Sequence, residues 1–233
     1  MITPGRLTQR ACLAWRWRCV RHALSLSGLL EVVEWARNNC PGQFDDNAKY
    51  FDVDFQLYRN TAFAIRLGLH KGRSQRILDL GAGCGWFCVV ARYFGHEVTA
   101  VDVEHELYTR CMSHWNIPQF VHRIRARTPL PHFGSQFDLV VGLSVCFNGH
   151  EHGPLWGVPE WHFFFEDLAQ QTTPTARLFM TINAQSDGSY LPEPVARYVA
   201  DRGASISGRY VNLPLHGPDH GRSVATTMTE SPP

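Results

Sequence analysis

The feature that most constrains the fold of this chain is a regular alternation, from residue 76 onward, between short apolar runs and segments of helix length. Short apolar runs bounded by turn residues are typical of buried strands, and a helix-length segment suffices to cross between parallel strands. The alternation predicts an α/β fold with a doubly wound, Rossmann-like sheet, mostly parallel, with helices on both faces. The predicted strands are residues 76–80, 97–103, 120–123, 137–143 and 177–182, and the predicted helices are residues 85–94, 104–115, 161–171 and 194–202.

Further segments flank this pattern on both sides. Residues 50–69 are predicted to form a helical, aromatic-rich approach to the sheet. Two β-leaning stretches near the end, residues 204–212 and 222–229, predict a C-terminal antiparallel hairpin. The expected organisation is an arginine-rich helical extension over residues 1–46, one domain over residues 47–229 and a frayed tail at residues 230–233.

The composition excludes several classes of partner. A net charge of +1, from 22 basic and 21 acidic residues, supplies no overall field for nucleic acid or an anionic membrane. The seven cysteines are odd in number and contain no CxxC pair, which favours a reducing, cytoplasmic setting. The arginine bias of residues 1–30 can mark a targeting or membrane-surface helix. Its arginines and tryptophans do not separate into faces, so we favour a helix packed on the domain.

Three alternate glycines, Gly81, Gly83 and Gly85, stand where the strand at residues 76–80 must turn into a helix. Glycine permits positive φ and lets the backbone approach a ligand without a Cβ. The dinucleotide fingerprint G-x-G-x-x-G would require a further glycine where Trp86 stands. A nicotinamide oxidoreductase is therefore the weaker alternative.

The sequence Asp-Leu-Gly-Ala-Gly-Cys-Gly at residues 79–85 resembles motif I of the class I S-adenosylmethionine (SAM) methyltransferases. The resemblance implies the class I methyltransferase fold, with SAM as the cofactor. It implies that Gly81, Gly83 and Gly85 pass beneath the methionine part of SAM, and that Asp79 helps to hold the amino group. Ala82 and Trp86 are included in the predicted cofactor site.

A β-rich run at residues 95–103 ends on a second acid, Asp102, roughly twenty residues after the glycine turn. A carboxylate at a strand end can accept hydrogen bonds from both hydroxyls of a ribose. The run resembles the family's motif at the end of the second strand, which assigns Asp102, with its neighbour Val103, to the ribose. The alternative is that Asp102 caps the helix that begins near Glu104.

Two later landmarks agree less evenly with the family. Its members often place an acid and a small residue after the third strand to meet the adenine, whereas this chain has Arg-Ala-Arg-Thr at residues 125–128. Residues 133–141 resemble the family's fourth strand, and we interpret Asp138 within it as structural.

The methyl acceptor is expected beyond the fourth strand, in residues 144–162, which are dense in His and Trp. A protonated acceptor needs a base, for which His150, His152 and His162 are candidates, His150 first. With Cys146 these histidines also suggest a metal site, but their spacing matches no strong zinc pattern, so no metal is predicted. Cys146 is placed in the cofactor site, and Tyr50 is the candidate lid residue.

The substrate class is inferred largely by exclusion. The Asn/Asp-Pro-Pro-Tyr/Phe motif of similar enzymes that methylate base or amide nitrogens is absent, and Cys-Phe-Asn stands at residues 146–148 instead. With no basic stripe in the sequence, a nucleic-acid substrate is disfavoured. We predict a small-molecule or sugar-like acceptor methylated on O, N or C. A non-catalytic scaffold that keeps the fold is the second alternative.

Overall fold

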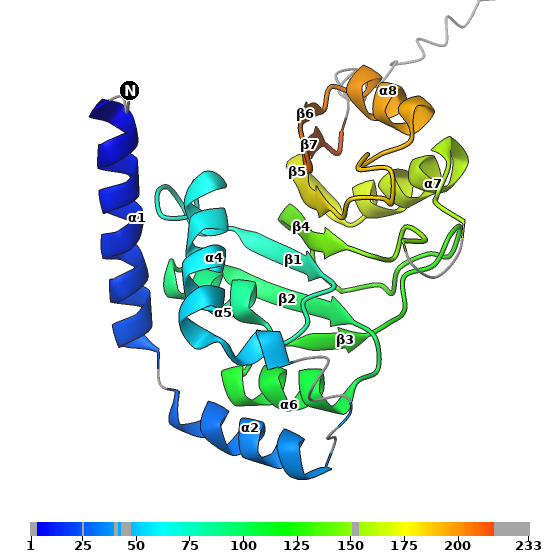
Figure 1. The fold of residues 1–233 in the computed structure, drawn as a ribbon. Coiled ribbons are helices and arrows are strands. Elements are labelled where there is room, and N and C mark those ends of the chain that lie inside the picture. The colour runs from blue at the N-terminus through cyan, green and yellow to red at the C-terminus, as the bar shows by residue number, and fades with distance from the viewer. Residues whose placement is uncertain (1–3, 25, 40–41, 43–47, 151–153, 217–233) are drawn as a thin grey trace, which may run out of the picture.

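The computed structural model describes residues 4–24, 26–39, 42, 48–150 and 154–216. Its centre is a seven-stranded sheet in the order β3-β2-β1-β4-β5-β7-β6 (Figure 1). The first five strands pair in parallel, whereas β7 pairs antiparallel with both β5 and β6. The predicted class I methyltransferase fold, with its C-terminal antiparallel hairpin, is confirmed. The strands are β1 Arg76–Leu80, β2 Glu97–Asp102, β3 Gln119–Val121, β4 Phe137–Val145, β5 Thr172–Ile182, β6 Ser205–Ser207 and β7 Tyr210–Pro214.

Helices cover both faces of this sheet, and the strands divide their side chains between two cores. In β4, Leu139 and Val141 point into one core and Val140 into the other, as the two-residue period of a strand requires. Because helices bury both faces of the central strands, side chains on both faces are apolar, and the strands read as continuous apolar runs in the sequence. The first core lies under α4 Val53–Arg66, α5 Trp86–Tyr93 and α6 Glu106–Trp115, and the second under α7 Val158–Ala169 and α8 Glu193–Asp201.

The arginine-rich beginning is helical and packs on the outside of the first helix layer (Figure 1). In α1 Pro4–Ala23, Arg21 Nε contacts Asp54 Oδ1 of α4 at 2.9 Å. In α2 Ser27–Asn39, the Trp35 ring lies 3.7 Å from the guanidinium carbon of Arg110 on α6. Among the described helices, none is long and apolar enough to cross a bilayer.

The structure confirms a C-terminal hairpin but corrects its predicted bounds. The first β-leaning stretch, residues 204–212, itself contains the turn between β6 and β7. Gly208, with φ of +56°, supplies the left-handed conformation that a tight hairpin needs. The second stretch, residues 222–229, and the tail at residues 230–233 lie outside the described residues.

Helix starts and one strand start also differ from the prediction. α7 begins at Val158 rather than residue 161, since Glu160 accepts a hydrogen bond from the Gly157 amide at 3.1 Å and so caps the first turn. α6 begins at Glu106 rather than residue 104. β5 begins at Thr172, because its first residues pair with the start of β4 at Phe137 before the main register begins.

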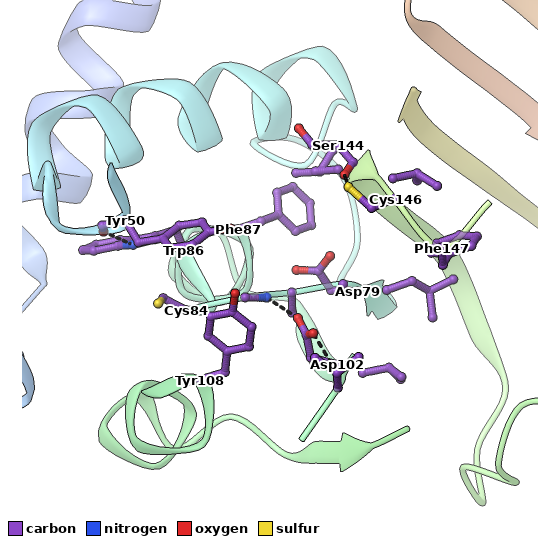
Figure 2. A pocket seen from close by; sticks show the side chains of 18 of the residues that line it. Tyr50, Asp79, Cys84, Trp86, Phe87, Asp102, Tyr108, Ser144, Cys146 and Phe147 are labelled. Atoms are coloured by element: carbon purple, nitrogen blue, oxygen red, sulfur yellow. Dashed lines mark hydrogen bonds between the residues drawn. The ribbon is translucent and has the colours of Figure 1, made fainter. Parts of the chain in front are cut away.

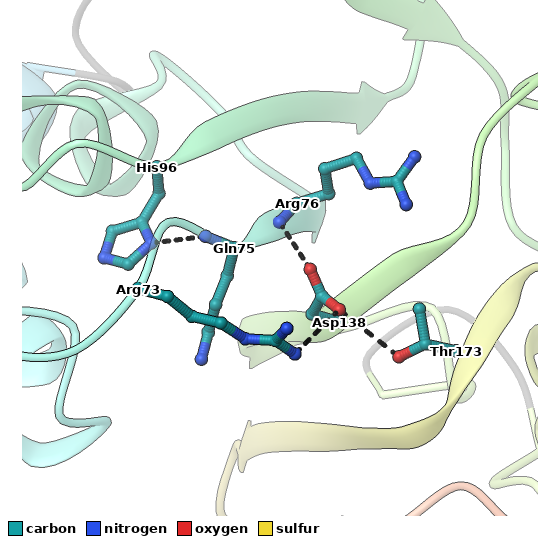
Figure 3. Close-up of polar contacts among 6 residues, drawn as sticks. All are labelled: Arg73, Gln75, Arg76, His96, Asp138 and Thr173. Atoms are coloured by element: carbon teal, nitrogen blue, oxygen red, sulfur yellow. Dashed lines mark hydrogen bonds and ion pairs between the residues drawn. The ribbon is translucent and has the colours of Figure 1, made fainter.

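At the amino ends of the parallel strands, Asp138 ties β4 to its neighbours (Figure 3). Asp138 Oδ2 accepts a hydrogen bond from the Arg76 amide of β1 at 2.9 Å, and Oδ1 accepts one from the Thr173 hydroxyl of β5 at 3.4 Å. The crevice described below lies at the opposite, carboxyl ends of the strands. The strand order reverses there between β1 and β4, which is where ligands bind in open α/β sheets.

Candidate functional site

The carboxyl ends of β1, β2 and β4 open into a crevice of about 570 Å³ (Figure 2). It has two parts. The glycine-turn half comprises Asp79, residues 81–83 and Asp102, and the β4 half comprises Arg59 of α4 and residues 144–147. Of the residues predicted from the sequence, the crevice is lined by Tyr50, Asp79, Gly81, Ala82, Gly83, Trp86, Asp102, Val103 and Cys146.

The three glycines of the turn have positive φ but different neighbours. Gly81 has φ of +74° and open space where a Cβ would be, and its amide donates to Val101 O of β2 at 2.8 Å. Gly83, with φ of +55°, also lines the crevice. A Cβ on Gly85 would lie 2.9 Å from Met112 Sδ of α6. Gly85 therefore serves the close packing of α6 and does not line the predicted cofactor site.

Asp102 ends β2 with its carboxylate inside the crevice and 9% of the residue exposed. Oδ2 accepts the Gly83 amide at 2.5 Å and Oδ1 accepts the Val103 amide at 2.7 Å. Burial raises the pKa of Asp102, and these two backbone donors oppose the shift. Each oxygen keeps acceptor capacity for a further donor. The alternative role was wrong, because α6 begins after His105, so Asp102 does not cap it.

Asp79 lies deeper, 2% exposed, at the end of β1. Its Oδ2 accepts a hydrogen bond from Cys88 Sγ of α5 at 3.2 Å. Among the described residues, no basic side chain forms an ion pair with Asp79. Burial raises the pKa of Asp79 to about 7. A buried carboxyl of this kind gains much from a cationic ligand, which would compensate the cost of ionisation.

Aromatic residues cover the glycine turn. Tyr50, in the short 3₁₀ helix η1 Ala48–Phe51, holds its ring over Gly83, where an added Cβ would lie 3.8 Å away. The rings of Tyr50 and Tyr108 meet edge to face with centroids 6.1 Å apart. The Trp86 indole donates to Tyr50 O at 2.7 Å and is 3% exposed. Trp86 is the first residue of α5, at the position where the dinucleotide fingerprint has its third glycine.

The β4 half is shaped by an irregular strand end. Ser144 has φ of +62°, and the pairing of β4 with β5 shifts register between Leu143 and Val145. The Ser144 amide donates to the buried Thr181 hydroxyl at 2.6 Å. A bulge redirects side chains, and here it directs the Ser144 hydroxyl toward the crevice. Figure 2 shows Ser144 and Cys146 across the crevice from Tyr108 and Asp102.

Of the three predicted histidines, the two that the structure describes, His150 and His162, do not line this crevice. His162 lies on α7, where Nδ1 is hydrogen-bonded to the Tyr198 hydroxyl at 2.9 Å. His150 does not line the crevice, and His152 falls outside the described residues. These positions do not support His150 or His162 as a base for a ligand bound there. No group of three metal-ligating side chains occurs in the part of the chain that is described.

Several lining residues were missed from the sequence. His122, directly after β3, could have been found by the rule that ligands meet strand ends. Tyr108 stands in the first turn of α6, the helix that follows Asp102. Gln56, Arg59 and Asn60 come from α4, and no local motif marks them.

Comparisons with known proteins agree with this fold at low identity. The sequence matches no protein-family model and no curated protein. Among solved structures, the glycopeptide N-methyltransferase MtfA with SAM aligns at 14% identity, covering 66% of this chain and 63% of that one, with a TM-score of 0.42. The PH0226 protein from Pyrococcus horikoshii OT3 aligns at 17%, covering 71% and 92%, with a TM-score of 0.49.

A third match is an amino pentose methyltransferase from Micromonospora echinaspora, at 20% identity, covering 56% of this chain and 52% of that one, with a TM-score of 0.43. The chain spans less than two thirds of the length of the glycopeptide N-methyltransferase structures. These likenesses concern the fold alone. The residues of the crevice must therefore decide what it can bind.

Proposed function

We propose that this chain is a SAM-dependent methyltransferase of class I. The observation that carries the proposal is the meeting of Asp79, the bare turn at Gly81 and Gly83, and Asp102 in one crevice at the switch point of the sheet. SAM presents an ammonium group, a ribose diol and an adenine ring. The buried carboxyl of Asp79 matches the ammonium group, the turn without side chains leaves room for the methionine chain, and the carboxylate of Asp102 matches the ribose diol.

The chain's residues fit SAM across the strand ends. Asp79 would hold the amino group, since its buried carboxyl has no cationic partner among the described residues. Asp102 would accept hydrogen bonds from the ribose hydroxyls with its remaining lone pairs. His122 and Ile124, beyond β3, line the crevice where the adenine would then lie. When bound, SAM supplies an electrophilic methyl group on a sulfonium.

The chain's own contribution to methyl transfer is mainly alignment. Holding two reactants in line can supply several kcal/mol of a barrier, roughly 7 or more in favourable cases. Tyr50 and Tyr108 cover the glycine turn and exclude water from it. Ser144, Cys146 and Phe147 form the wall on the β4 side, where the acceptor would lie. An acceptor with a free lone pair needs no base at this position.

We further propose a small-molecule or sugar-like acceptor. A crevice of about 570 Å³ is within the range of small-molecule sites, roughly 300–1,000 Å³. Its lining comes from α4, η1 and the strand ends and includes no extended basic stripe for a nucleic acid.

Isothermal titration of the full chain with SAM, with its demethylated product S-adenosylhomocysteine (SAH) and with NADH tests the cofactor directly. The proposal predicts binding of SAM and SAH and none of NADH, because Trp86 stands where the dinucleotide fingerprint has its third glycine. Binding of NADH alone, or of none of the three, would contradict it. Methyl transfer from radiolabelled SAM into small-molecule extract fractions then separates an enzyme from a non-catalytic scaffold.

A further inference from the structure

Two arginines from distant parts of the chain meet at one hydroxyl in the β4 half of the crevice. Arg59 Nη2 of α4 donates to Ser144 Oγ at 2.9 Å, and Arg209 Nη2, between β6 and β7, donates to the same oxygen at 3.3 Å. Arg59 and Ser144 both line the crevice. Two guanidinium groups therefore stand together beside the place where the acceptor is expected.

No carboxylate among the described residues pairs with either arginine. The carboxyl groups that line the crevice are Asp79 and Asp102, and both belong to the glycine-turn half. Burial, and next the charge of Arg209, lower the pKa of Arg59. Two like charges close together in a half-buried site repel each other unless an anion joins them.

The surrounding residues hold this arrangement in place. Asn183 Oδ1 accepts a hydrogen bond from Arg209 Nη2 at 3.4 Å, while Asn183 Nδ2 donates to Ser144 O at 3.3 Å. Thr181 fixes the Ser144 amide, as described above. The Nε–H of Arg209 is buried and has no hydrogen-bond partner among the described residues. The pair therefore keeps donor capacity that the protein itself does not use.

From this arrangement we propose that Arg59 and Arg209, with Ser144 between them, bind an oxyanion, the carboxylate or phosphate of the methyl acceptor. Guanidinium groups present planar pairs of N–H donors that match both kinds of oxyanion. The acceptor is then a small anionic molecule, anchored at β4 with its nucleophilic atom toward the glycine-turn half. That the bound anion is the methyl acceptor rests on the proposed function, whereas the oxyanion site itself rests on the two arginines alone.

The site is tested by NMR titration of arginine side-chain N–H resonances. The full chain, with and without saturating SAH, is titrated with inorganic phosphate and separately with acetate, at constant ionic strength. We expect at least one anion to bind the wild type and its Kd to rise at least tenfold in Arg59→Gln and in Arg209→Gln. Arg59→Lys, which keeps the charge but loses the planar fork, should weaken binding less. Preference for phosphate or for acetate identifies the group carried by the acceptor.

Arg66→Gln is the matched control. Arg66 lies exposed on the same helix, its guanidinium carbon 4.0 Å from the Tyr210 ring, so its loss removes the same charge without touching Ser144. The oxyanion site is overturned if the wild type binds neither anion, if both glutamine variants bind as the wild type does, or if Arg66→Gln weakens binding equally. SAH binding is measured on the same samples. Arginine-dependent anion binding without SAH binding would keep the site and reject the methyltransferase.

Discussion

The two halves of the crevice are built in different ways. The glycine-turn half comes from two short stretches of sequence, residues 79–83 and Asp102, held by adjacent parallel strands. The β4 half contains Arg59 of α4 and Ser144 of β4, and these two residues and Arg209 of the hairpin meet only in the folded chain. The first half carries two buried carboxyl groups. The second carries the Arg59 guanidinium, with that of Arg209 beside it, and neither forms an ion pair with a carboxylate among the described residues.

This difference indicates where the proposed cofactor and the proposed acceptor would each be recognised. The glycine-turn half, which is made from local motifs, offers exposed backbone and two carboxyl groups. These would suit the cationic and hydroxyl groups of SAM. A half made from distant side chains can vary while the sheet stays the same, which suits an acceptor that differs between enzymes. Changes in the glycine-turn half should therefore affect cofactor binding, and changes elsewhere should leave it intact.

The largest effect is expected from Gly83→Leu. A side chain at this positive φ is strained and would grow toward the Tyr50 ring inside the crevice. We expect the Kd for SAH to rise by about 100-fold or more, equivalent to about 2.7 kcal/mol, in isothermal titration.

Gly95→Leu is its control, because Gly95 has φ of +90° with nothing within 4 Å and does not line the crevice. It should lose about 1–2 kcal/mol of stability through backbone strain and keep its SAH affinity. Equal loss of SAH affinity in both variants would show that strain, and not position in the crevice, is what matters.

Asp102→Asn should weaken SAH binding by about 1.5–3 kcal/mol, roughly a tenfold to hundredfold rise in Kd, because hydrogen bonds to a charged acceptor are lost. Asp138→Asn is the matched variant at the opposite edge of the sheet, where the carboxylate also accepts a backbone amide (Figure 3). It should lower the melting temperature and leave SAH affinity unchanged. The ribose assignment fails if SAH affinity responds alike in the two variants.

SAH affinity should depend on pH through Asp79. With the pKa of Asp79 raised to about 7, the free protein is largely protonated there at pH 6 and largely ionised at pH 8. Because the ionised form attracts an ammonium group, we expect affinity to fall about tenfold from pH 8 to pH 6. Asp79→Asn should bind SAH weakly with no such dependence. A flat wild-type profile would remove Asp79 from the cofactor site.

Ionisation of the buried Asp79 should lower the stability of the unliganded protein. A folded pKa of about 7 against an unfolded value of about 3.9 means that the folded state binds the proton more tightly. Its stabilising contribution is full below pH 3.9 and is lost as pH rises through 7. Asp79→Asn should therefore melt at a higher temperature than the wild type at pH 8 without ligand. A lower melting temperature would contradict this sign.

The smallest expected changes in SAH affinity come from a comparison of two histidines, His122 and His162. His122 lines the crevice beyond β3, so His122→Ala should raise the Kd for SAH by roughly threefold to tenfold. His162 is hydrogen-bonded to Tyr198 of α8 and does not line the crevice, so His162→Ala should leave the Kd unchanged. An effect of His162→Ala on SAH binding comparable to that of His122→Ala would revise the extent of the site.

The sequence predicted what short-range physics determines. The strand at residues 76–80, the glycine turn and Asp102 follow from apolar runs, positive φ and strand ends, and the predicted β1 bounds match those observed. Gly85 shows the limit of such a motif, because contact with Met112 of another helix adds to the requirement that its positive φ already sets.

Long-range packing determined what the sequence did not reveal. Arg59 and Arg209 carry no local signal, since only the antiparallel placement of β7 beside β5 brings Arg209 to Ser144. The density of histidines after β4 suggested a base, but His162 lies on α7, where its ring is hydrogen-bonded to the Tyr198 hydroxyl.

A crystal structure of the full chain with SAH tests the central claim most directly. The account predicts the ribose hydroxyls within hydrogen-bond distance of the Asp102 carboxylate, the amino group beside Asp79, and the homocysteine chain along the backbone of Gly81 and Gly83. SAH bound elsewhere, or a crevice closed by protein atoms with Asp102 directed away from the ligand, would contradict it.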